Sequence, residues 1–228
     1  MFRKAVLAAG ALMLSATVSH GSTIITFESF NNGDVVTNIV AGSLTATVSA
    51  TGGINVASIC DTDLTPQECD DPDLLDPFTG NPGDFASDNT PSPLGKVLIV
   101  QERGTISNGT VPVADDFARG GTILLSFNKA VTLDSVTIVD VERGAFEIAL
   151  GGITLNATDA STDGISGENL FEDFVPNQVV YGTSLLFRSS TSFAIDNISV
   201  TAVPLPASLA LLLGGVAGLA AVRRRATV

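Results

Sequence analysis

Between residues 22 and 203 the chain is a series of short segments rich in Val, Ile, Thr and Phe, separated by Gly, Asn, Asp and Pro. Such segments are typical of β-strands bounded by turns, and no part of this range shows convincing helical periodicity. About ten short strands in one domain predict an all-β fold, a β-sandwich of the jelly-roll kind. The segments expected to form strands are STIITF, VVTNIV, LTATVSA, KVLIVQE, TILLSF, VTLDSVTIVDVE, AFEIAL, ITLNA, QVVYG, SLLFRS and FAIDNISV.

Two apolar segments flank this domain, which we assign to residues 22–202. Residues 1–21 have a basic start, an apolar run and small residues near position 21, the pattern of a secretory signal peptide. Residues 207–222 are 16 apolar or small residues, followed by Arg223, Arg224 and Arg225. A helix of that length spans about 24 Å, slightly short of a bilayer core, and the arginines would stay on the cytoplasmic side. The sequence therefore predicts an exported domain with a single C-terminal transmembrane helix.

The C-terminal segment, residues 203–228, resembles the sorting tail of bacterial exosortase substrates, the PEP-CTERM-type proteins, in its VPLPA variant. The resemblance implies recognition and removal by an exosortase-type transpeptidase, in a Gram-negative bacterium that makes extracellular polysaccharide. The mature protein would then reach the cell envelope or the extracellular matrix. The residues that carry the resemblance, besides the apolar helix and the three arginines, are Val203, Pro204, Leu205, Pro206 and Ala207.

The composition of the domain excludes several functions. Five of the 11 Lys and Arg residues lie in the two terminal segments and none of the 24 acidic residues does, so residues 22–203 carry a net charge of −18. Such a surface repels nucleic acid and attracts cations. The only histidine, His20, lies in the predicted signal peptide, so the mature chain cannot build a Ser-His-Asp site or a His-ligated zinc site. We therefore expect no nucleic-acid partner and no enzymatic activity.

The two cysteines, Cys60 and Cys69, lie at the start of a long acidic segment, residues 60–90. In an exported protein such a pair predicts a disulfide, and the redox spacing C-x-x-C is absent. The segment contains nine acidic residues and four prolines, and it is too long for an ordinary connection between strands. Two interpretations remain open: a solvated, charge-extended loop, or a Ca²⁺ site built from carboxylates.

A more local indication of calcium comes from the first and last strands. The segments ITFESFNNGD and FAIDNISV resemble the terminal strands of galactose-binding-like jelly rolls, the architecture of many carbohydrate-binding modules. The resemblance implies a structural Ca²⁺ held by Glu28 and Asp196 together with backbone carbonyls of the neighbouring turn. Strand alternation would place Asp196 on the face of Ala194, Ile198 and Val200, but Phe193 and Ile195 are also apolar, so either face fits the pattern. The alternative is an exposed Asp at a sheet edge.

A second acidic pair, Asp140 and Glu142, is expected on one face of a strand. Paired carboxylates are used in glycoside hydrolysis, although most such pairs are a solvated strand face. Sugar binding usually involves exposed aromatic residues, but the chain has no Trp and one Tyr, Tyr181. The sequence favours an acidic Ca²⁺-binding domain with a structural, adhesive or polysaccharide-binding role. The alternative is an extracellular glycan-active enzyme that uses Asp140 and Glu142.

Overall fold

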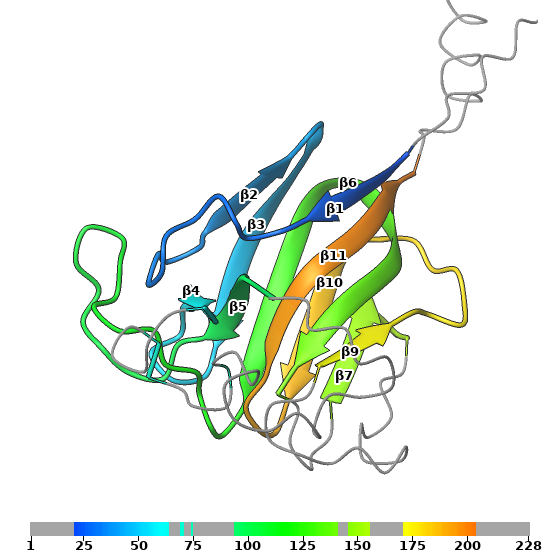
Figure 1. Ribbon diagram of the computed structural model, residues 1–228. Helices are drawn as coiled ribbons and strands as arrows, with labels where there is room; N and C mark the ends of the chain where they lie inside the picture. Colours follow the sequence, from blue (N-terminus) through cyan, green and yellow to red (C-terminus); the bar gives the residue numbers. More distant parts are fainter. Residues whose placement is uncertain are drawn as a thin grey trace, which may run out of the picture. The chain divides into compact units, whose positions relative to one another are not determined.

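The computed structural model describes residues 21–63, 69–70, 74, 94–140, 146–155 and 171–203 (Figure 1). Residues Gly21–Leu205 make up one compact unit. The described part is all-β, as the sequence predicts. It includes no helix long and apolar enough to cross a membrane, and the segments assigned to the signal peptide and to the helix 207–222 lie outside it. The strands are β1 (Ser22–Ile25), β2 (Asn38–Ala41), β3 (Leu44–Thr51), β4 (Ala57–Asp61), β5 (Lys96–Val100), β6 (Gly121–Val139), β7 (Phe146–Leu150), β8 (Ile153–Thr154), β9 (Phe171–Phe174), β10 (Gly182–Ser189) and β11 (Ala194–Ala202).

The strands form one curled antiparallel sheet organised around β6. The first part of β6, up to Phe127, lies between β3 and β10. Its last part, from Val131 onward, pairs with β11 on one side and, over its final four residues, with β9 on the other. Strands β2, β7 and β8 extend the first group, whereas β1, β5 and β4 extend the second. One long strand thus carries two groups of strands (Figure 1).

The strand pattern of the sequence is largely right, with four differences. TILLSF and VTLDSVTIVDVE were expected to be separate strands but belong to the single 19-residue strand β6. Strands β4 and β9 were not predicted, because β4 runs into the acidic segment and β9 has acidic residues at two of its four positions. QVVYG forms no strand before β10 begins at Gly182. These are errors of strand boundaries and of polar edge strands, where local sequence carries little information.

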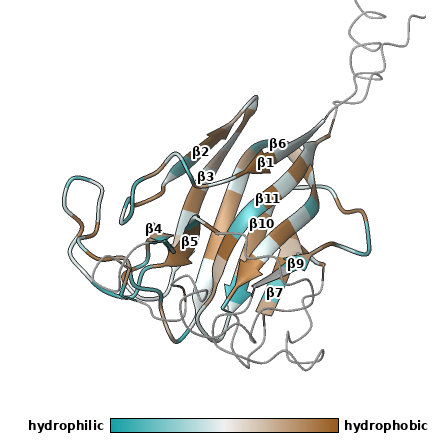
Figure 2. Cartoon of the chain, in the orientation of Figure 1, coloured by the Kyte–Doolittle hydropathy of each residue, from teal (hydrophilic) through white to brown (hydrophobic). Residues whose placement is uncertain are grey.

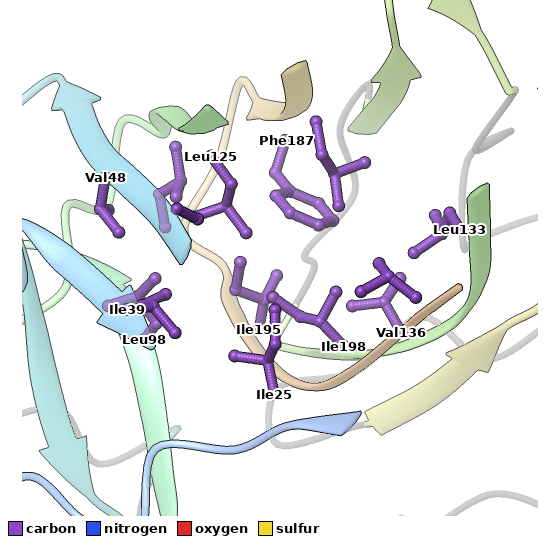
Figure 3. Close-up of a cluster of buried hydrophobic side chains, with 14 of the residues drawn as sticks. Ile25, Ile39, Val48, Leu98, Leu125, Leu133, Val136, Phe187, Ile195 and Ile198 are labelled. Carbon is purple, nitrogen blue, oxygen red and sulfur yellow. The ribbon is translucent and has the colours of Figure 1, made fainter. Parts of the chain in front are cut away.

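Residues of both strand groups contribute to one main hydrophobic core. In β3 buried and exposed residues alternate strictly, so one face packs inward and the other faces solvent. Figure 2 shows the hydropathy of the residues along the strands. Figure 3 shows Leu125 and Phe187 from the first group near Ile195 and Ile198 from the second. Fully burying a side chain of this size contributes about 1.5–3 kcal/mol to stability.

A second, smaller core cluster lies around the disulfide. Cys60 and Cys69 are bonded, with Cα atoms 5.6 Å apart, as the sequence predicts. Both are fully buried, so the bond is part of the interior. The other members of the cluster are Leu74, Val97, Ile99, Ala114, Val139 and Ala194. β5 is therefore covered on both faces, which explains why KVLIV is an uninterrupted apolar run after its lysine.

Candidate metal site

Asp196 is buried in β11, with 2% of its surface exposed, so the alternative of an exposed edge residue is wrong. The grouping of Ala194, Ile198 and Val200 on one face does not hold. Ile195 and Ile198 both belong to the main core although they are three residues apart, whereas Ala194 belongs to the smaller cluster. The register of β11 against β6 shifts between Asp196 and Ser199. Such a bulge inserts one extra residue, so simple alternation cannot be carried across it.

The bulge centres on Asn197, whose φ is 48°. Asn is one of the few residues besides Gly that tolerates this left-handed conformation. On its other edge β11 pairs with β5 up to Ile195 and with β1 from Ile198 onward. Asp196 and Asn197 therefore lie where β11 changes partners, between the start of β5 and the end of β1. Backbone carbonyls at such an interruption are not committed to the regular sheet ladder.

Glu28 reaches the same point from the end of β1. The Phe30 amide donates to the Phe27 carbonyl at 3.0 Å, which closes a tight turn with Glu28 as its second residue. Phe27 is fully buried in the main core, and Phe30 packs against that core. The two rings are 6.4 Å apart and anchor both ends of the turn. Glu28 is consequently held at the surface while its neighbours are fixed in the interior.

The start of β5 contacts Glu28 through its backbone and its first side chain. The Lys96 amide donates to Glu28 Oε1 at 3.0 Å, and Lys96 Nζ donates to the Glu28 carbonyl at 3.2 Å. Lys96 Nζ also lies 4.0 Å from Asp61 Oδ2 at the end of β4. The Glu28 carbonyl and one of its carboxylate oxygens are therefore already engaged, while Oε2 accepts no hydrogen bond from the described residues.

The electrostatics of Asp196 are those of a carboxyl group that lacks compensation. Burial raises its pKa from 3.8 to about 7; a hydrogen bond from the Asn197 amide works against this shift, and the negative charge of Glu28 adds to it. Within the described residues Asp196 Oδ1 is buried without a hydrogen-bond partner. The structure thus brings Glu28 and Asp196 close enough for their charges to interact.

A calcium ion is chemically suited to this arrangement, because Ca²⁺ takes about six to eight oxygen ligands from carboxylates, carbonyls and water. No group of three His, Cys, Asp or Glu side chains gathers anywhere in the described ranges. The other ligands would have to be backbone carbonyls and water. The bulge at Asp196–Asn197 lies next to the two carboxylates and could supply such carbonyls. A cation would relieve both the repulsion between the carboxylates and the burial of an uncompensated Asp196 oxygen.

Asp140, half of the alternative catalytic pair, does not lie on a strand. It follows the last residue of β6, has a φ of 54° and is 1% exposed. Its Oδ2 accepts a hydrogen bond from Ser192 Oγ at 2.8 Å. The expected solvated strand face is therefore wrong for Asp140, because the change of backbone direction turns the side chain inward. Glu142 lies outside the described residues.

The described part of the acidic segment is bonded to the connection between β5 and β6. Asp70 lies 2.6 Å from Arg103 Nη2, and the Nε of the same guanidinium lies 2.8 Å from Asp115 Oδ2. The charges of Asp115 and then Asp70 raise the pKa of Arg103. A protein cation thus neutralises the acid beside Cys69, whereas most of the acidic residues from 68 to 90 lie outside the described residues.

Sequence reasoning missed Gly95, Lys96 and Asn197, which position the two predicted ligands. The available signal for Asn197 was an Asp-Asn pair inside an otherwise apolar strand, typical of a bulge. Gly95 and Lys96 gave no such signal, because only the fold places them beside Glu28. No protein-family model matches this chain, and no curated protein compared with it is similar in sequence.

Proposed function

We propose that this protein is an exported, calcium-stabilised β-sandwich of jelly-roll type, sorted to the cell envelope or extracellular matrix, with a structural, adhesive or polysaccharide-binding role. The observation that carries the proposal is the burial of Asp196, which is 2% exposed. Its Oδ1 has no hydrogen-bond partner among the described residues, and the nearby charge of Glu28 repels its ionised form. Native proteins rarely retain such a group without a ligand or counter-ion.

The sheet topology supports the sandwich interpretation. Strand β6 shares its first part with β3 and β10 and its last part with β11 and β9, and residues of both groups pack into one core. A long strand that changes partners along its length is a common way to join the two layers of a β-sandwich. A domain of this kind uses its core for stability and presents its surface for binding or assembly.

The arrangement of the two ends of the domain supports sorting by the C-terminal tail. Ser22 pairs with Thr201 in the antiparallel β1–β11 ladder, so the first strand begins beside the end of the last strand. Asp134 Oδ2 accepts hydrogen bonds from Ser22 Oγ at 2.8 Å and from Thr201 Oγ1 at 2.7 Å. The Val203 amide still donates to the Ala130 carbonyl at 2.8 Å. The proposed sorting motif therefore begins where the last strand leaves the sheet.

Calcium is expected to raise the melting temperature of the ectodomain, residues 22–203. A ligand that binds only the folded state adds about 2.7 kcal/mol at a hundred times its dissociation constant. At about 2–4 °C per kcal/mol, this is a rise of about 5–10 °C. The measurement is a melting curve in Ca²⁺, in Mg²⁺ and in chelator at fixed ionic strength, because general screening also relieves charge repulsion.

The matched variants are Asp196→Asn and Asp134→Asn. Both substitutions remove one carboxylate from the second strand group. Asp134, however, lies on β6 beside the start of β1 and the end of β11, and already accepts hydrogen bonds from Ser22 and Thr201. We expect Asp196→Asn to abolish most of the calcium effect and Asp134→Asn to retain it. Equal responses to Ca²⁺ and Mg²⁺, or an unchanged Asp196→Asn variant, would refute the proposed site.

Removal of the tail is a separate expectation. In a host with an exosortase-type transpeptidase, the mature protein should lack residues 207–228, because the VPLPA motif, apolar segment and arginines resemble its substrates. Intact-mass measurement of the secreted or envelope form tests this, with a variant whose residues 203–207 are replaced as the control. A full C-terminus on all molecules in that host contradicts the sorting assignment.

A further inference from the structure

Gly95, immediately before β5, has a left-handed backbone conformation and lies against the Glu28 carboxylate. Its φ is 65°, in the left-handed region that favours glycine. A Cβ placed on Gly95 would lie 2.3 Å from Glu28 Oε1, 2.9 Å from Glu28 Cδ and 3.0 Å from Oε2. The Glu28 carboxylate thus lies against the bare backbone of Gly95, in the space where any other residue would have its side chain.

The adjacent amide completes this contact. Lys96 N–H donates to Glu28 Oε1 at 3.0 Å, so one carboxylate oxygen is fixed to the backbone while the other remains available. This contact lies at the start of β5, opposite the place where β11 leaves β5 and bulges at Asn197. The contact therefore holds Glu28 beside the part of β11 that contains the buried Asp196.

We infer that Gly95, together with the Lys96 amide, is the positioning element that orients the Glu28 carboxylate for cation binding with Asp196. The inference rests on the proposed calcium site and adds to it a residue that carries no ligand atom of its own. Glu28 is exposed and sits on a turn, so without this contact its side chain would sample several rotamers and lose conformational entropy on binding a cation. The contact fixes the side chain in advance.

The test compares Gly95→Asn with Gly42→Asn in the full-length protein in detergent, by calorimetric titration with CaCl₂. Asn tolerates a left-handed φ, so both variants keep the backbone conformation. Gly42 has a φ of 59° and no heavy atom within 4 Å of an added Cβ. We expect Gly95→Asn to weaken Ca²⁺ binding about tenfold or more and Gly42→Asn to leave it unchanged, with similar urea midpoints for both variants in chelator.

A measurement on the unaltered protein covers the case in which Gly95→Asn does not fold. In ¹⁵N-labelled protein the amide resonances of Gly95 and Lys96 should shift on titration with CaCl₂, while that of Gly42 should not. If the unaltered protein binds Ca²⁺ but Gly95→Asn binds equally well, or the Gly95 and Lys96 resonances stay in place, the inference about Gly95 is wrong and the calcium site stands. If the unaltered protein shows no response to CaCl₂ at all, both are wrong.

Discussion

Without calcium, the domain should become more stable as the pH is lowered from 7 to 5, by about 2 kcal/mol from Asp196 alone. The folded-state pKa of Asp196 is raised from 3.8 to about 7. Between these values the folded protein holds a proton that the unfolded chain has released, so stability falls as the pH rises through this range. At about 1.4 kcal/mol per pKa unit the whole penalty is about 4 kcal/mol, complete above pH 7 and absent below pH 4.

The measurement is the free energy of urea unfolding in chelator at several pH values, for the unaltered ectodomain and for Asp196→Asn. Stability also changes with pH because other carboxylates are protonated and the net charge of −18 becomes smaller. The Asp196→Asn variant retains nearly all of these other pH effects, so it serves as the control. We expect the difference between the two profiles to follow the titration of Asp196. Saturating Ca²⁺ should remove the advantage of low pH, because a bound cation favours the ionised form. Parallel profiles for the two proteins would contradict the assignment.

Replacing both cysteines, Cys60→Ala with Cys69→Ala, should cost about 2–4 kcal/mol of unfolding free energy. The bond closes a loop between residues nine apart, and both sulfur atoms are in the smaller core cluster. Loss of the bond releases the start of the acidic segment, so the Asp70–Arg103 ion pair would lose its anchor. Urea unfolding of the variant and of the oxidised protein measures the difference.

Addition of dithiothreitol provides the control. The buried disulfide of the folded protein should be reduced only through unfolding, whereas in urea the reductant should lower the midpoint of the unaltered protein to that of the double variant. The double variant itself should not respond. A double variant as stable as the oxidised protein would show that the smaller cluster is held by its apolar contacts alone.

The all-β class and the disulfide could be predicted from the sequence, whereas only the resemblance to galactose-binding-like domains singled out Glu28 and Asp196. Short β-branched segments between turn residues leave no other regular structure, and a chain with two cysteines has one intramolecular pairing. The strict alternation of β3 was readable from LTATVSAT, because each residue of a half-buried strand faces either the core or solvent. These features depend on local chemistry.

The break in the alternation at Asp196 and the neighbours of Glu28 follow from the tertiary structure. The bulge at Asn197 changes the alternation of β11 at the place where its partner changes from β5 to β1, a pairing between segments distant in the sequence. Gly95 looks like an ordinary loop glycine until the Glu28 carboxylate, 67 positions away, lies where its Cβ would be. Asp140, just after the end of β6, is likewise buried against Ser192, a residue 52 positions away. Strand alternation is a local property, whereas the places where it breaks are set by how distant strands pair.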